Sequence, residues 1–125
     1  MSQFWIGNLY LMLSMLMGAA GQVALKHVMN RTGPLSLDSR MFFSVVSTGS
    51  APVAGMGIAL LIASVLFWFA CLGRLDLSYA YPVACASAIF VVFFGVMFLG
   101  EAATFRSVVA TCLIVAGTAM LATTR

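Results

Sequence analysis

The stretch PVAGMGIALLIASVLFWFACLG, residues 52–73, decides the fold class, because it carries no charged side chain over the length of a membrane span. A helix needs about 20 consecutive apolar residues to cross the hydrocarbon core of a bilayer. Proline is tolerated in the first turn of a helix, so Pro52 suits the beginning of this one. The stretch therefore predicts a transmembrane helix over residues 52–73.

Similar charge-free runs lie on both sides of this stretch. Hydrophobic residues make up 63% of the chain and charged residues 7%, whereas about 25% of the residues in a soluble domain are charged. So few charges could not cover the surface of a small soluble domain. We predict an all-α membrane protein, a single bundle of four transmembrane helices at residues 4–29, 52–73, 79–99 and 105–123.

A shorter apolar segment separates the first two predicted spans. Residues 30–34 should end the first helix, and Asp38 can cap the segment that follows. Residues 38–48 are too few to cross a bilayer, so we predict a short helix lying at the membrane interface. A cleavable signal peptide is the alternative interpretation of the N-terminal run, but no Lys or Arg precedes that run.

Basic residues at the ends of the predicted spans bear on orientation and on partners. Lys26, Arg31, Arg40 and Arg106 fall at one predicted membrane face, and Arg74 and Arg125 fall at the other. This small bias leaves both orientations open. A net charge of +3 at helix ends indicates contact with lipid head groups, not with nucleic acid.

The sequence contains no recognisable enzyme motif, and its three cysteines fall in three different predicted spans without metal-binding spacing. We therefore expect no catalytic residue, no cofactor and no metal site.

The first predicted span has a polar line, because Gly18, Gln22 and Lys26 recur at intervals of four residues. Polar groups at membrane depth usually face the bundle interior or a wet cavity. We expect Gln22 and Lys26 to contact a polar or anionic head group, and Gly18 and Gly21 to let a neighbour approach closely. Alternatively, Lys26 extends to the interface and Gln22 bonds a neighbouring helix. His27 is either a proton carrier or an interface residue.

Two further groups lie at the ends of the third span. Tyr79 and Tyr81 precede Pro82 and either anchor the helix at the interface or shape the mouth of a substrate path. Glu101 and Arg106 flank the next turn, where a helix cap or an ion pair is expected.

The last predicted span carries a stripe of small and aliphatic residues, Ala110, Leu113, Ile114 and Gly117. Such a stripe favours close helix packing. We expect it to pack against a second copy of the chain or a paralogue.

Four stretches resemble motifs of short drug/metabolite transporters. They are the G-Q-x-x-x-K pattern at residues 21–26, S-x-A-Y-P at residues 78–82, L-G-E at residues 99–101 and I-x-A-G at residues 114–117. The small multidrug resistance branch couples export to a glutamate in its first helix, at the position that Gly18 occupies here. That mechanism cannot be carried over to this chain.

The chain is more similar to the EamA-like branch, which includes subunits of an aminoarabinose-phosphoundecaprenol flippase. The resemblance implies movement of a polyprenyl-phosphate-linked sugar or similar anionic lipid across the bacterial inner membrane, by a homodimer or a heterodimer with a paralogue. Lys26 would attract the phosphate, and Gln22, Tyr79 and Tyr81 would contact the head group. The alternatives are a small multidrug exporter and a non-transporting membrane subunit of a glycosyltransferase system.

Overall fold

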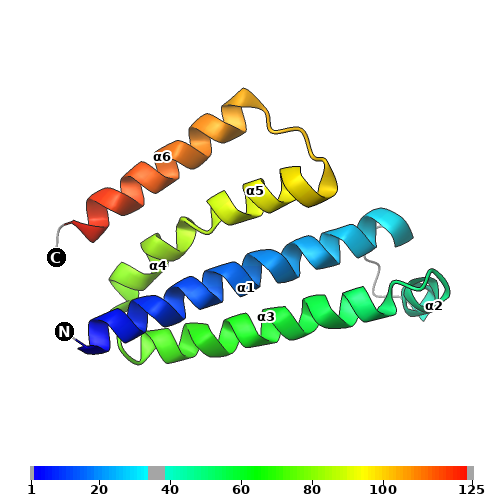
Figure 1. Cartoon of the computed structure of the whole chain (residues 1–125), viewed down its shortest axis with the longest axis horizontal. Helices are drawn as coiled ribbons and strands as arrows, with labels where there is room; N and C mark the ends of the chain where they lie inside the picture. Colours follow the sequence, from blue (N-terminus) through cyan, green and yellow to red (C-terminus); the bar gives the residue numbers. More distant parts are fainter. Residues whose placement is uncertain (1, 34–38, 124–125) are drawn as a thin grey trace.

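The computed structural model describes residues 2–33 and 39–123, and the elements in these ranges are all helices. In chain order they are α1 (Ser2–Thr32), α2 (Ser39–Ser47), α3 (Ala51–Leu72), α4 (Leu77–Cys85), α5 (Ala88–Leu99) and α6 (Phe105–Ala122) (Figure 1). Three apolar helical stretches are long enough to cross a membrane, namely α1, α3 and the pair α4–α5, and α6 is a shorter apolar helix. The all-helical prediction is confirmed, and these apolar helices indicate a membrane protein.

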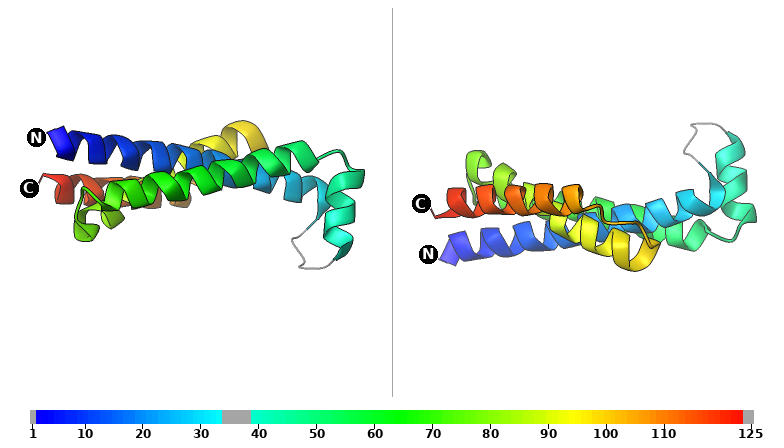
Figure 2. Two further views of the ribbon diagram at one scale, coloured as in Figure 1. Left: turned by 90° about the horizontal axis from the view of Figure 1, so that it is seen from below. Right: turned by 90° about the horizontal axis from the view of Figure 1, so that it is seen from above.

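The helices lie roughly along one direction, with α3 and α1 side by side, α4–α5 next to α1, and α6 at the outer edge (Figure 1). The short helix α2 lies across the end of the bundle where α1 ends and α3 begins (Figure 2). Its residues match most of the predicted segment 38–48, although Asp38 lies outside the described residues.

The first helix is longer than predicted, because it continues through residues 30–32. The Thr32 hydroxyl donates to the Val28 carbonyl (2.9 Å). This hydrogen bond ties the last residue of the helix to the turn before it. Gly33 then adopts a φ of +92°, a conformation that glycine tolerates far better than other residues. The helix therefore ends at Thr32, just before Gly33, and not at Met29 as predicted.

The main packing interface of the bundle joins α1 and α3. On α1 it includes Gly7, Leu11, Ser14, Gly18, Gly21 and Leu25, and opposite them lie Gly57, Leu61, Ser64, Cys71 and Leu75. On α1 the intervals alternate between four and three residues, and on the facing side they are four, three, seven and four, with Leu75 just after the end of α3. Such spacing keeps a contact seam on one side of each helix. We call these residues the α1–α3 seam.

Glycine allows the closest approach within the α1–α3 seam. A Cβ added at Gly21 would lie 2.9 Å from the carbonyl oxygen of Gly57, and a Cβ at Gly18 would lie 2.9 Å from the Ser64 hydroxyl oxygen. Small residues bring transmembrane helices together because dispersion contacts replace the hydrophobic driving force there. Gly18 and Gly21 thus face α3 at close range.

Two serines bond each other in the middle of the same seam. The Ser14 hydroxyl donates to the Ser64 carbonyl (2.9 Å), and the Ser64 hydroxyl donates to the Ser14 carbonyl (2.8 Å). Each hydroxyl thus has an acceptor on the facing helix, which is the usual way in which serine is accommodated inside a membrane bundle.

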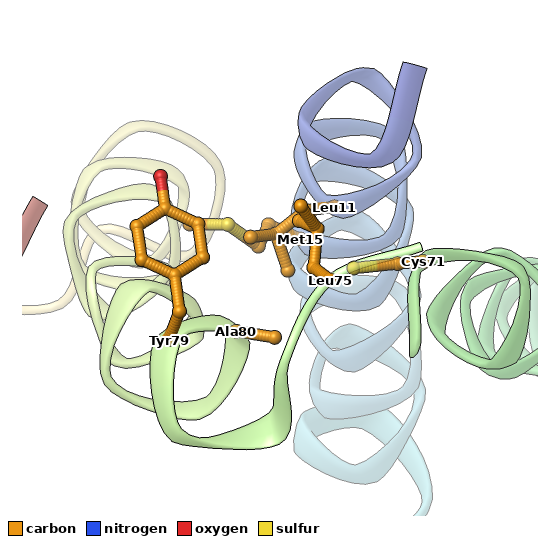
Figure 3. Packing of buried hydrophobic residues seen from close by; sticks show 6 residues of the cluster. All are labelled: Leu11, Met15, Cys71, Leu75, Tyr79 and Ala80. Atoms are coloured by element: carbon orange, nitrogen blue, oxygen red, sulfur yellow. The ribbon is translucent and has the colours of Figure 1, made fainter. Parts of the chain in front are cut away.

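A second layer forms where α4 docks on the N-terminal half of α1. Leu11, Met15, Cys71, Leu75, Tyr79 and Ala80 form its buried apolar cluster (Figure 3). The Tyr79 hydroxyl donates to Asn8 Oδ1 at 3.1 Å, and the Tyr79 ring lies 5.8 Å from the ring of Phe4. Tyr79 therefore acts here as a helix-packing residue.

Substituting Tyr79→Phe should lower the free energy of unfolding by about 1 kcal/mol, because the Asn8 amide oxygen loses its donor while the ring contacts remain. Thermal unfolding in detergent micelles measures this change. Tyr81→Phe is the matched control, since the Tyr81 side chain is 61% exposed. Equal destabilisation by the two variants would contradict this role of the Tyr79 hydroxyl.

The third predicted span, residues 79–99, is interrupted. It begins earlier, at Leu77, and divides at Ala86 and Ser87 into α4 and α5. Around this break the amides bond three residues back, as in Ala86 N–H to Val83 O (3.0 Å) and Ser87 N–H to Ala84 O (2.9 Å). Such tight turns mark helix interruptions. Pro82, predicted in the first turn, lies inside α4, where it provides no amide for the ladder.

Helix α6 is the least buried element of the bundle. It packs mainly on α4 and touches α5 only weakly, and none of its described side chains is fully buried. A Cβ added at Gly117 would meet no atom within 4 Å. One side of α6 is therefore uncovered by the described part of the chain.

Candidate functional site

An apolar groove of about 520 Å³ lies between α1, α3 and α5. Its walls are Ala20, Val23, Ala24 and His27 of α1, Val53, Met56 and Leu60 of α3, and Phe94 and Phe98 of α5. We call it the α1–α3–α5 groove. His27 provides its single titratable side chain, so the groove suits a long apolar group with a polar end.

The spacing of these residues explains the hollow. Ala20, Val23, Ala24 and His27 recur at three- and four-residue intervals and therefore form one stripe of α1. The two alanines are small, whereas Phe94 and Phe98 project from the facing wall. The small side chains of Ala20 and Ala24 leave space in front of the Phe94 and Phe98 rings, and no other side chain in the described part of the chain fills it.

Basic side chains lie at the end of the bundle where α1 ends and α2 lies across. Lys26 and Arg31 of α1 and Arg40 of α2 belong to this end, and they are all exposed. Arg106, predicted at the same membrane face, is exposed in the first turn of α6, and α6 begins well short of this end (Figure 1). His27 thus lies at the basic end of the groove, and an anionic head group would be attracted there.

The polar line predicted on α1 is divided between two faces. Gly18 faces Ser64 in the α1–α3 seam, whereas Gln22 and Lys26 are exposed and do not line the groove. A step of four residues turns about 40° around a helix, so two steps separate Gly18 from Lys26 by about 80°. Gln22 has no hydrogen-bond partner in residues 2–33 or 39–123. Its amide and the Lys26 ammonium are both available to a ligand or another chain.

The predicted partners of Lys26 lie at the other end of the bundle. Tyr79 bonds Asn8, which precedes Lys26 by 18 residues, a distance of about 27 Å along α1. Tyr81 is exposed, and its ring lies 5.5 Å from that of Trp68 in an edge-on contact. One copy of the chain therefore does not bring Lys26 together with Tyr79 and Tyr81.

Glu101 and Arg106 are not paired with each other. The Glu101 amide donates to the Gly95 carbonyl (3.3 Å), and its carboxylate lies so close to Gly95 that an added Cβ there would be 3.2 Å from it. Gly100 has a φ of +67°, which turns the chain back for this contact. Glu101 thus packs back against α5 at Gly95. Arg106 has no ion-pair partner in the described residues.

His27 is the site residue that sequence reasoning undervalued. The signal was present, because Ala20, Ala24 and His27 lie on one face of a helix at intervals of four and three residues. Alanines alone do not distinguish a groove from a packed interface, since the difference depends on where α5 crosses.

The predicted dimer stripe on α6 is accessible. Leu113 is 68% exposed and Ile114 41% exposed, and Ala110 and Gly117 are exposed beside them. Its packing against a second copy stays a prediction.

Comparison with known proteins assigns no family, since no family model, curated protein or solved structure matches this chain. The functional inference therefore starts from the α1–α3–α5 groove and its basic end.

Proposed function

We propose that this chain is a flippase of the bacterial inner membrane that moves a polyprenyl-phosphate-linked sugar, or a similar anionic lipid, between the leaflets. The observation that carries the proposal is the α1–α3–α5 groove, which is apolar along its walls and has His27 at its basic end. This combination fits an amphiphile with a long hydrocarbon tail and a negatively charged head group.

Two physical effects support this ligand class. Packing of a tail against the groove walls restores dispersion contacts that an unfilled hollow lacks. Each basic residue near a membrane surface attracts an anionic lipid by about 1 kcal/mol. The exposed Lys26 and Arg31 lie within the last two turns of α1, close to His27. An anionic head group would therefore be drawn towards the end of the groove that His27 marks.

In the proposed membrane arrangement α6 is the fourth span and α2 lies at the interface. α6 has 18 residues, which gives about 27 Å against a hydrocarbon core of about 30 Å. Arg106 in its first turn can extend to the head groups and make up the difference. On α2, Phe43 is 75% and Val46 53% exposed, as expected for a helix that rests on lipid.

A homodimer, or a heterodimer with a paralogue, would cover two surfaces that the single chain leaves bare. One is the α6 stripe, and the other is the α1 face with Gln22 and Lys26. An unpaired amide facing hydrocarbon is unfavourable, so Gln22 favours a partner or a head group at this face. In a pair of opposite orientation, Tyr79 and Tyr81 of one copy would come to the membrane depth of Lys26 in the other.

Transport in proteoliposomes tests the proposal. A fluorescent polyprenyl-phosphate sugar in the inner leaflet becomes quenchable from outside only after it flips. We expect Lys26→Ala to slow flipping about fivefold, which corresponds to the loss of one attractive charge. Lys26→Arg should keep most of the rate because it preserves the charge.

Each result has a distinct meaning. An unchanged rate for Lys26→Ala at equal protein density would remove Lys26 from the mechanism. A wild-type rate equal to that of protein-free vesicles would refute the flippase, and co-purification of a glycosyltransferase would then favour the non-transporting subunit.

A further inference from the structure

The last turns of α1 carry two basic side chains on the groove side of the helix. Ala20, Ala24, His27 and Arg31 follow one another at intervals of four, three and four residues, so they form a single stripe of α1. The first three line the α1–α3–α5 groove, and Arg31 continues the stripe one turn beyond it. Helix α1 also extends past the end of α5 (Figure 1), which leaves Arg31 at the mouth of the groove.

Lys26 lies off this stripe. Adjacent residues of a helix are turned by about 100°, so Lys26 is about 100° away from His27 and about 140° away from Arg31 around the axis of α1. Its side chain does not line the groove. Lys26 can therefore attract an anion to this end of the bundle, whereas His27 and Arg31 are the basic residues that the head group of a lipid in the groove would reach.

His27 and Arg31 are both available to a ligand. Neither makes a hydrogen bond or an ion pair within residues 2–33 and 39–123. His27 is half-buried and Arg31 is exposed, as expected for an inner and an outer contact of one head group. Residues four apart on a helix have Cβ atoms about 6 Å apart, which allows one phosphate to contact both side chains.

The charged groups around His27 are mostly positive. The described groove walls from α3 and α5 contain no titratable side chain. Beyond α5, the Glu101 carboxylate lies against a glycine of that helix which does not line the groove. Helix α2, which touches α1, carries Arg40, and α1 itself adds Lys26 and Arg31. A cleft end surrounded by charges of one sign concentrates ligands of the opposite sign.

We propose, on the basis of the function proposed above, that His27 and Arg31 together bind the phosphodiester of the lipid in the α1–α3–α5 groove, with His27 in its protonated form. The guanidinium presents two parallel donors to phosphate oxygens, and an imidazolium adds a charged N–H donor. Arginine keeps its charge throughout the physiological range, whereas histidine gains or loses its charge between pH 5 and 8. The head group is therefore held by two cations at acidic pH and by one at alkaline pH.

Equilibrium binding tests the pair without requiring transport. Wild-type protein in uncharged detergent micelles is titrated with a fluorescent polyprenyl-phosphate sugar, whose phosphodiester keeps one negative charge across this pH range. We expect the affinity to fall about fivefold between pH 5.5 and pH 8, which is the effect of losing one attractive charge. Equal affinities at the two pH values would overturn the proposal.

Substitutions separate the two cations. His27→Gln should bind the probe at pH 5.5 only as well as the wild type does at pH 8, and His27→Lys should bind it equally at both. Arg31→Gln should weaken binding about fivefold at either pH and keep the pH dependence. Arg106→Gln is the matched control, since it removes another exposed arginine without an ion-pair partner in the described residues, and it should bind as the wild type does. A pH dependence that persists in His27→Lys, or equal losses in Arg31→Gln and Arg106→Gln, would contradict the pair.

Binding and flipping can fail independently. Binding that depends on pH through His27, without flipping in proteoliposomes, would uphold the pair and refute the flippase. Flipping by a protein whose binding is indifferent to pH and to both substitutions would do the reverse. Inorganic phosphate that displaces the probe as efficiently as unlabelled lipid would assign the two cations to a free anion and overturn the lipid site.

Discussion

Replacing Gly21 by leucine should destabilise the bundle by about 3 kcal/mol, because an overpacked interface has to separate. Even the first side-chain carbon would lie 2.9 Å from the Gly57 carbonyl oxygen and 3.0 Å from Leu61. Backbone cannot move aside as a flexible side chain can, so α1 and α3 would shift apart along the seam. The Ser14–Ser64 hydrogen bonds lie about two turns away and would lengthen with them.

Gly55→Leu is the control for this variant. It adds the same side chain to a transmembrane glycine, but no atom lies within 4 Å of the added carbon. Its effect should stay within about 0.5 kcal/mol. Unfolding of both variants in mixed micelles, followed by circular dichroism, measures the difference. If Gly21→Leu were as stable as Gly55→Leu, the close α1–α3 contact would not form in the membrane.

Filling the α1–α3–α5 groove should stop transport without unfolding the chain. Ala24→Trp places an indole among groove-lining side chains that leave about 520 Å³ free. The indole excludes the lipid tail sterically and regains dispersion contacts with the walls. We expect the flipping rate in proteoliposomes to fall to that of protein-free vesicles while the unfolding temperature is retained.

The control is Ala59→Trp, which adds the same ring to the exposed face of α3. It should transport at the wild-type rate. Normal flipping by Ala24→Trp would show that the substrate does not pass through this groove. Loss of flipping in both variants would instead indicate a general effect of tryptophan on the bundle.

The helices could be predicted from the sequence because charged side chains are costly inside a bilayer, so charged residues mark where the spans end. The charge-free stretch of residues 52–73 became α3, Ala51–Leu72, and the last predicted helix also ends within one residue of the observed α6. Less local features were missed. The break at Ala86–Ser87 has no proline or glycine to announce it, and Pro82 lies one turn before it.

Pairing between helices was the part that the sequence left open. Gly18, Gln22 and Lys26 share a four-residue spacing, but the actual seam alternates steps of four and three and therefore excludes Gln22 and Lys26. Among the predicted site residues, Lys26 and Gln22 remain accessible, whereas Tyr79 bonds Asn8 at the opposite end. A groove depends on how three helices cross, which no single helical pattern reports.

The α1–α3 seam also has a consequence for the order of events on the ribosome. Leu75 completes the seam, and Phe105, where α6 begins, follows 30 residues later (105 − 75). At 5–20 residues per second, translation of that interval takes roughly 2–6 s. The hairpin of α1 and α3 therefore has time to satisfy both serine hydroxyls before the last helix enters the membrane. Nascent chains with a defective seam would therefore be exposed to membrane proteases during synthesis.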